Sequence, residues 1–312
     1  MLYIIWVLCI FKVSLIKQKM KKRAILYLGG GGMMGLWGAG VLTKLQNLKT
    51  YDKIERVYAC SAGVFNGCYF LTKQMEKGSS IYYEDLPPDF INVWLVPYGA
   101  LQRIINGYIK KIKFSHIANV MNLNKLIDVA RNRKKLDVQK LKYQKVPLYV
   151  KVLDTKDNGV KYLDIRKGDV FKLMKASCSS IPYYFPNPEE ENYIDAAIKE
   201  PLGIRYLIKK YPKQKIVVIF NLSTKRNLWH YIKNFIEGFV ANSMYKGVFS
   251  NFMRREKDIR ESIKIAKKNK NILFISPKDE ENISSWEMNP LKLKKAYRNG
   301  MKHASKIAKF LK

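Results

Sequence analysis

The chain has 312 residues, 47% of them hydrophobic, which is enough to bury a substantial core. It contains no Ser/Gly-rich linker, internal repeat or long low-complexity tract, which argues against a repeat protein or a string of domains. Its formal net charge of +33 predicts attraction to nucleic acid, anionic lipid or another acidic surface. A biased usage of lysine, asparagine and isoleucine explains this charge equally well without a partner.

The first 16 residues are apolar except for Lys12 and Ser14. A membrane-spanning helix needs about 20 apolar residues, and the run lacks the charged start and cleavage site of a signal peptide. Two interpretations remain: residues 1–16 are a weak membrane anchor, or residues 1–19 are an apolar extension upstream of a true start at Met20. We favour the extension, because Met20 leads directly into the first predicted strand.

A glycine cluster follows that strand, which we expect at residues 24–28. Four consecutive glycines, 29–32, precede Gly35 and a predicted helix at 36–48. Glycines between a strand and a helix let backbone amides approach an anion closely. The spacing fits a dinucleotide pyrophosphate site, and it also fits an oxyanion hole formed by Gly30, Gly31 and Gly32.

A candidate nucleophile follows the second predicted strand, residues 55–60. Ser61 lies between small residues, Ala59 before it and Gly63 after it, and a helix is predicted at 62–75. This pattern is typical of a nucleophile elbow, which exposes the hydroxyl at a helix N-terminus. A dinucleotide site would instead end this strand in an acidic residue for the ribose, so the oxyanion hole is favoured.

The middle of the chain is less regular. Gly78 to Asp89 interrupts the helical pattern, and we expect residues 78–145 to form a lid or cap, with helices at 101–113 and 122–133. The stretch 101–114 mixes aromatic, aliphatic and basic residues. It fits either a helix packed on the core, which we favour, or one that lies on a bilayer.

A candidate acid follows a segment of small residues and prolines, 176–186, which resembles a pocket-lining loop. Tyr193 and Ile194 lead into Asp195, and Ala196 and Ala197 follow it. Most aspartates in such turns only form the turn or cap a helix, so this segment alone favours a structural role.

The remaining strands are predicted at 147–153, 160–164, 215–221 and 271–276, and the remaining helices at 167–176, 203–210, 229–244, 253–268 and 290–311. Strands that alternate with helices indicate a layered α/β fold with a mostly parallel sheet. Active loops should lie at the carboxyl ends of its strands.

Histidines and cysteines give little sign of a catalytic or metal site. His116, His230 and His303 have no catalytic context, and we expect His303 to lie exposed on a basic helix face. The four cysteines, at positions 9, 60, 68 and 178, show no metal-ligand spacing. We expect no metal, no cofactor, and a reducing, cytoplasmic location.

From Arg23 to Leu202 these segments, in this order, resemble the patatin-like phospholipase family. The resemblance implies an α/β/α fold in which residues 20–312 form a single domain, with Ser61 as nucleophile and Asp195 as its partner without a histidine. It also implies that Gly30, Gly31 and Gly32 form the oxyanion hole. The supporting motif positions are Gly35, Ala59, Gly63, Ala196 and Ala197.

Three residues depart from the family pattern. Met34 stands where the family usually has Arg or Lys, so one positive charge near the oxyanion site is missing. Ala59 replaces the first glycine of the elbow, and Ala196 replaces the glycine after the acid. If the turn at Ala196 needs a positive φ, alanine strains it by about 1 kcal/mol or more.

The leading expectation is a serine-dependent lipid acyl hydrolase, of phospholipase A or lysophospholipase type. It would act on phospholipids or other acyl-ester lipids and contact anionic membrane surfaces peripherally. One alternative is a lipid-binding homologue with impaired turnover. A second is a basic nucleic-acid-binding protein, but no helix-turn-helix, zinc or RNP-like motif supports specific binding. The sequence does not indicate an oligomeric state.

Overall fold

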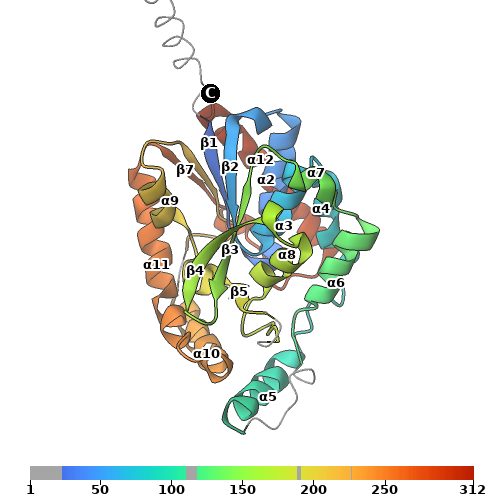
Figure 1. Ribbon diagram of the computed structural model, residues 1–312, viewed down its shortest axis with the longest axis vertical. Helices are drawn as coiled ribbons and strands as arrows, with labels where there is room; N and C mark the ends of the chain where they lie inside the picture. Colours follow the sequence, from blue (N-terminus) through green and yellow to red (C-terminus); the bar gives the residue numbers. More distant parts are fainter. Residues whose placement is uncertain (1–22, 110–117, 188–190, 226) are drawn as a thin grey trace, which may run out of the picture.

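The computed structural model describes residues 23–109, 118–187, 191–225 and 227–312. The predictions for the N-terminal extension and for residues 110–114 of the basic stretch lie outside these ranges. The described chain is a layered α/β protein with a mostly parallel central sheet flanked by helices (Figure 1), so the predicted fold class is confirmed.

The strands of this sheet are β1 (Ala24–Leu28), β2 (Ile54–Ala59), β3 (Leu148–Asp154), β4 (Gly159–Asp164), β5 (Tyr193–Asp195), β6 (Ile216–Ile219) and β7 (Ile272–Ile275). Their order is β4-β3-β2-β1-β6-β7, with β5 paired to β3. Strands β1, β2, β3, β6 and β7 pair in parallel, whereas β4 and β5 run antiparallel to β3. Parallel pairs require long crossovers, and helices supply them here.

Strand β3 brings β2 and β5 end to end. One edge of β3 pairs with β4 from Tyr149 to Asp154. A strand has only two edges, so β2 and β5 share the other one. Ala59 of β2 pairs with Val150, and Asp195 of β5 pairs with Val152. Asp195 therefore lies just beyond the carboxyl end of β2.

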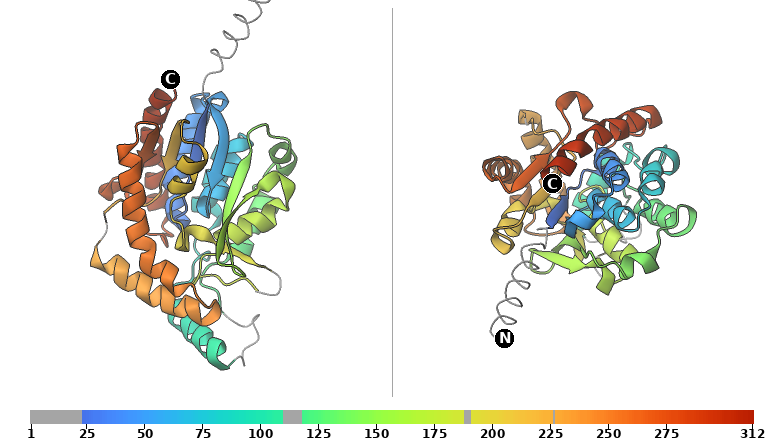
Figure 2. Two further views of the ribbon diagram at one scale, coloured as in Figure 1. Left: turned by 60° about the vertical axis from the view of Figure 1, so that its left-hand side comes forward. Right: turned by 90° about the horizontal axis from the view of Figure 1, so that it is seen from above.

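Alternating side chains of the strands bury both faces of the sheet. Leu26 and Leu28 belong to a cluster with the helices α2 (Gly35–Asn47), α3 (Ala62–Leu71) and α12 (Pro290–Phe310). Ile25 and Tyr27 belong to a second cluster with α9 (Ile204–Lys210) and α11 (Phe249–Lys268). Helices thus cover both faces, as the views in Figures 1 and 2 show.

The remaining α-helices of the described chain are α4 (Met75–Ser80), α5 (Leu95–Ile109), α6 (Leu123–Asp128), α7 (Val138–Lys142), α8 (Val170–Cys178) and α10 (Leu228–Met244). Helices α5 and α10 contact each other at the lower end of the molecule (Figure 2, left). A lid formed by residues 78–145, which include α5 to α7, stays a prediction. No helix in the described ranges has both the length and the apolar character needed to cross a bilayer.

Several boundaries and one side chain differ from expectation; helix α11, for example, begins at Phe249 rather than at 253. The predicted helix 62–75 ends at Leu71, because Lys73 adopts a φ of 60° that breaks the helix before α4. Helix α5 begins at Leu95 rather than at 101. The expected exposure of His303 is wrong: it is 7% exposed, it packs edge-on to Trp37 with ring centroids 5.0 Å apart, and its Nε2 lies 2.9 Å from a Glu281 carboxylate oxygen.

Candidate functional site

Ser61 occupies a strained turn between β2 and α3. Its backbone has φ 55° and ψ −131°, a conformation that residues other than glycine rarely adopt. The small residues around it allow close packing. A Cβ added to Gly63 would lie 2.3 Å from the Leu28 carbonyl oxygen, and one added to Gly35 would lie 2.6 Å from the Ala62 Cβ. Ser61 thus has the backbone of a nucleophile elbow.

A buried serine holds this turn on the sheet. The Ser61 amide donates to the Ser177 hydroxyl at 2.8 Å, and that hydroxyl donates to the Lys151 carbonyl oxygen at 2.9 Å. Ser177 has no exposed surface. The sequence pattern marked the segment 176–186 as a pocket wall but did not identify Ser177 as the residue that positions the elbow.

Asp195 is 3% exposed at the end of β5. Its Oδ1 accepts hydrogen bonds from the Cys60 thiol at 3.2 Å and from the Ala197 amide at 2.9 Å. Its own amide donates to the Ser179 carbonyl oxygen at 3.1 Å. Burial raises the pKa of the Cys60 thiol well above its usual value, and the Asp195 carboxylate raises this pKa further. The thiol therefore stays protonated and donates to the carboxylate.

The acid touches the elbow through the residue that precedes Ser61. Among the described residues, the Ser61 hydroxyl makes no hydrogen bond to Asp195. Catalytic hydrogen bonds are often long in unliganded enzymes and shorten when substrate binds. Cys60 nevertheless fixes the carboxylate beside the elbow, and Ser61 itself is only 6% exposed. The two predicted residues thus lie in one buried region.

The glycine loop passes directly beside Ser61. A Cβ on Gly30 would lie 2.8 Å from the Ser61 Cβ and 3.4 Å from its Oγ. Gly31 and Gly32 have φ values of 140° and 57°, which suit glycine. Within the described ranges, the amides of Gly30 and Gly31 donate to no protein acceptor. These amides are available to an anionic oxygen next to Ser61.

Asn221, which lies just after β6, orients this loop. Its Nδ2 donates to the carbonyl oxygens of Gly29 at 2.7 Å and Gly30 at 3.1 Å. In a planar trans peptide the carbonyl and the following amide point in opposite directions. The amides of Gly30 and Gly31 therefore point away from Asn221. No local sequence pattern identifies Asn221 as part of the site.

Two of the departures from the family pattern cause no backbone strain. Ala59 is fully buried at the end of β2. Ala196 begins a 3-10 turn, Ala196–Ile198, and is not among the described residues with positive φ. Met34 ends another 3-10 turn, Gly32–Met34, where it supplies no charge. The described residues contain no group of three or more His, Cys, Asp or Glu side chains arranged to hold a metal.

Comparisons with known proteins agree with this architecture. The family model of the patatin-like phospholipases matches residues 26–208, more than half of the chain. No curated protein matches the chain. Among solved structures, VipD from Legionella pneumophila is similar with a TM-score of 0.50 and 13% sequence identity, over 93% of this chain and 67% of that chain. At this identity the likeness concerns the fold alone. The family match identifies the chain as a member of the patatin-like phospholipase family.

Proposed function

We propose that the chain is a serine-dependent lipid acyl hydrolase that uses Ser61 and Asp195 as a catalytic dyad. Hydrolysis of lipid acyl esters is the general activity of its family. The observation that carries the proposal is the contact of Asp195 Oδ1 with the elbow, 3.2 Å from Cys60 Sγ, where β5 continues the line of β2. The proposed substrates are phospholipids or lysophospholipids.

In the first half of the reaction, Ser61 Oγ attacks the ester carbonyl carbon and its proton passes to Asp195. The backbone amides of Gly30, Gly31 and Gly32 stabilise the negative charge that forms on the carbonyl oxygen. The bond to the alcohol then breaks, and the alcohol leaves with the proton from Asp195. An acyl group remains on Ser61.

In the second half, a water molecule attacks the acyl carbonyl carbon while Asp195 accepts one of its protons. The same amides stabilise the second oxyanion. The bond to Ser61 Oγ breaks, the serine regains its proton from Asp195, and the fatty acid leaves. No metal or cofactor takes part in this sequence.

Two observations favour a second candidate, a lipid-binding homologue with impaired turnover. Met34 supplies no positive charge beside the loop, and Asp195 Oδ1 already accepts hydrogen bonds from Cys60 and Ala197. A fluorophosphonate probe separates the two candidates, because it reacts only with an activated serine. Labelling that is lost in Ser61→Ala supports the hydrolase, and absence of labelling with intact lipid binding supports the homologue.

The decisive test is hydrolysis of mixed phospholipids by purified variants, followed by mass spectrometry of the released fatty acids. Ser61→Ala and Asp195→Asn should each lower the rate by at least about 10³-fold, because each removes a reacting group. The exposed positions Ser305→Ala and Asp52→Asn serve as matched controls and should retain full activity. Wild-type turnover in either dyad variant would exclude this mechanism.

A further inference from the structure

Helix α10 has its polarity reversed relative to an ordinary surface helix. Six large apolar side chains of α10 are exposed: Leu228, Trp229, Ile232, Phe235, Ile236 and Phe239. The buried side of the same helix contains the polar residues Asn234 and Glu237 besides Gly238, Val240 and Ala241, and the Glu237 carboxylate accepts a hydrogen bond from Tyr183. Polar groups inside and aromatic groups outside indicate that the outer side is not made for water.

The neighbouring helix α5 shows the same reversal. Tyr98 and Leu101 are exposed on it, and Val93 and Trp94 are exposed just before it, Trp94 at 86%. Arg103 is buried instead, where its guanidinium donates to the Ala118 carbonyl oxygen at 2.6 Å and lies 4.6 Å from the centre of the Phe185 ring. Since α5 and α10 contact each other, we call these ten exposed side chains the α5–α10 apolar face.

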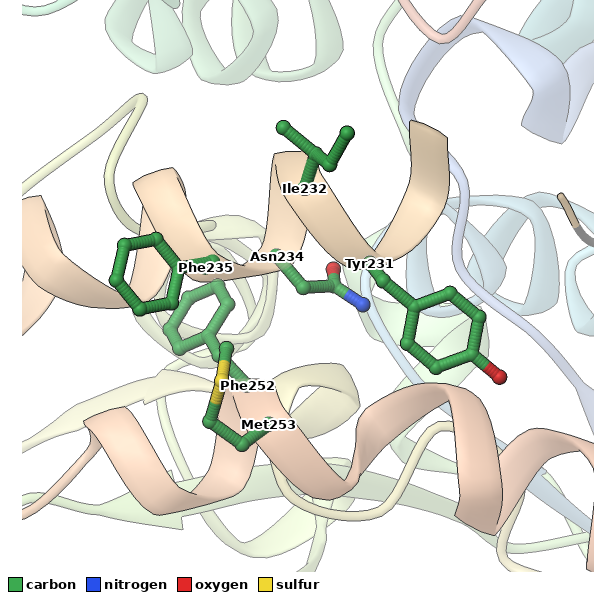
Figure 3. A pocket seen from close by; sticks show the side chains of 6 residues that line it. All are labelled: Tyr231, Ile232, Asn234, Phe235, Phe252 and Met253. Atoms are coloured by element: carbon green, nitrogen blue, oxygen red, sulfur yellow. The ribbon is translucent and has the colours of Figure 1, made fainter. Parts of the chain in front are cut away.

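The helix that presents most of the apolar face packs into the core cluster next to the proposed active site. Ala241 of α10 and Tyr245, at its end, belong to the cluster that contains Cys60 and Ala196. A hollow of about 390 Å³ opens between α10 and α11, lined by Ile232, Phe235 and Met253 among others (Figure 3). Phe252 lines this hollow and belongs to the same cluster as Cys60. The face is therefore at the end of the molecule that contains the site.

The distribution of charge around this face indicates what kind of surface it binds. The sequences of α5 and α10 contain a single acidic residue, Glu237, which is buried. Exposed cations follow in the sequence: Lys246 comes shortly after α10, and Arg254 follows Met253, which lines the hollow. Aromatic and aliphatic side chains bordered by cations, on a protein of net charge +33, fit the headgroup region of an anionic bilayer.

We propose that the α5–α10 apolar face docks on anionic lipid bilayers and holds the proposed active site against its substrate. Only the role of docking, which is to bring the active site to its substrate, rests on the proposed function. Binding to the bilayer itself requires no hydrolysis. The exposed aromatic rings enter the headgroup region, and the surrounding cations are attracted to anionic lipids, each by about 1 kcal/mol. Docking should therefore weaken as salt is added.

The test measures flotation of the Ser61→Ala protein with phosphatidylcholine vesicles that contain or lack phosphatidylserine. We expect strong flotation with phosphatidylserine and much less without it. Adding Trp229→Ser, Phe235→Ser and Ile236→Ser should weaken binding about 10³-fold, because each of the three side chains contributes roughly tenfold. The controls Tyr143→Ser and Leu291→Ser remove apolar side chains elsewhere that are even more exposed, at 84% and 75%, and should bind unchanged.

A second measurement does not depend on folding of the triple variant. In a Ser61→Ala protein that also contains Trp6→Phe, which removes the tryptophan of the N-terminal segment, vesicles with brominated acyl chains should quench the tryptophan fluorescence. The further conservative changes Trp94→Phe and Trp229→Phe should remove most of this quenching while the protein still floats. Flotation and quenching that survive removal of the α10 side chains would overturn the docking site. So would a self-association that the triple variant abolishes without any loss of flotation, because the face would then bind a second copy.

Failure of docking and failure of the proposed function are distinguishable. Hydrolysis of a water-soluble short-chain ester by wild-type protein tests Ser61 and Asp195 without any bilayer. Lost flotation in the triple variant, together with an inactive wild type, would support docking and reject the dyad. If ester hydrolysis depends on Ser61 but flotation is unchanged when side chains of the α5–α10 apolar face are removed, docking is rejected and the dyad is supported.

Discussion

At the scale of single residues, one buried amide controls the direction of the proposed oxyanion donors. Asn221 uses both hydrogens of Nδ2 on two successive loop carbonyls, at 2.7 and 3.1 Å. Its Oδ1 has no hydrogen-bond partner in the described structure. This oxygen packs against Gly38, where an added Cβ would lie only 2.3 Å from it. Leaving a buried oxygen unsatisfied costs about 1–3 kcal/mol, which indicates that the donor side of this amide is what the site requires.

Replacing this donor by an acceptor should disable the loop. In Asn221→Asp a carboxylate would face two carbonyl oxygens and repel them, so the amides of Gly30 and Gly31 would lose their direction. We expect kcat to fall about 10²-fold, near the effect of losing one oxyanion donor, with little change in KM. Steady-state hydrolysis of a short-chain ester measures both constants.

Asn282→Asp introduces the same charge at an exposed position and is the control for this variant. A normally folded Asn221→Asp protein with near wild-type kcat would show that Asn221 does not position the loop. A large rise in KM with unchanged kcat would also contradict this role, because orientation of the oxyanion donors acts on the transition state.

The site residues differ in whether the local sequence predicts them. Ser61 is predicted from a local signal, because it follows an apolar run and lies between small residues, whereas Asp195 is predicted only from the order of motifs that resembles the family. Asn221 and Ser177 have no such signal. Asn221 bonds Gly29 across 192 positions of the chain, and only the neighbouring places of β6 and β1 in the sheet bring the two residues together. The local sequence pattern does not predict which strands are neighbours in the sheet.

At the scale of elements, the alternating pattern predicted most of the sheet and its helices. Strands β1 and β4 match the predicted ranges to within one residue. Strand β5 was missed because it has three residues, too few to show a period. The boundary between α3 and α4 was missed because Lys73 adopts the left-handed backbone that usually marks glycine. The reversed polarity of α5 and α10 also escapes the pattern, which assumes that apolar sides face inward.

Helices α2 and α12 cross so closely that two glycines are required. A Cβ on Gly300 would lie 1.9 Å from the Trp37 carbonyl oxygen, and one on Gly40 would lie 2.1 Å from that of Tyr297. Gly300→Ala would push α12 away from α2 and should lower the free energy of unfolding by about 2–4 kcal/mol, in the range of strong overpacking.

Urea denaturation measures this loss, with Lys306→Ala at an exposed position of α12 as the matched control. Alanine normally favours a helix over glycine by about 1 kcal/mol, so a Gly300→Ala protein as stable as wild type would refute the tight crossing. Helix α2 begins at Gly35, directly after the glycine loop, and its displacement should reduce ester hydrolysis as well.

At the scale of the whole molecule, the net charge of +33 opposes folding, because like charges repel most strongly in the compact state. Added salt screens this repulsion. We therefore expect Tm to rise by several degrees as sodium chloride increases from about 20 to about 300 mM, over which the screening length falls severalfold. Calorimetry at neutral pH measures the change.

The charge-reduced variant Lys264→Glu, Lys295→Glu and Lys306→Glu is the control, since all three side chains are exposed. Its Tm should respond less to salt because less repulsion remains. A wild-type Tm that falls with salt would mean that attractive ion pairs, such as those of Arg166 with Asp164, outweigh the repulsion.

The end-to-end arrangement of β2 and β5 on β3 has a consequence for how the protein acquires activity. Strand β5, which contains Asp195, has only three residues. Asp195 follows Ser61 by 134 positions in the chain. A refolding chain can complete β1, β2 and β3 and still lack its acid. Recovery of ester hydrolysis should therefore lag behind recovery of secondary structure, and enzymatic competence should appear only when this short strand closes the sheet.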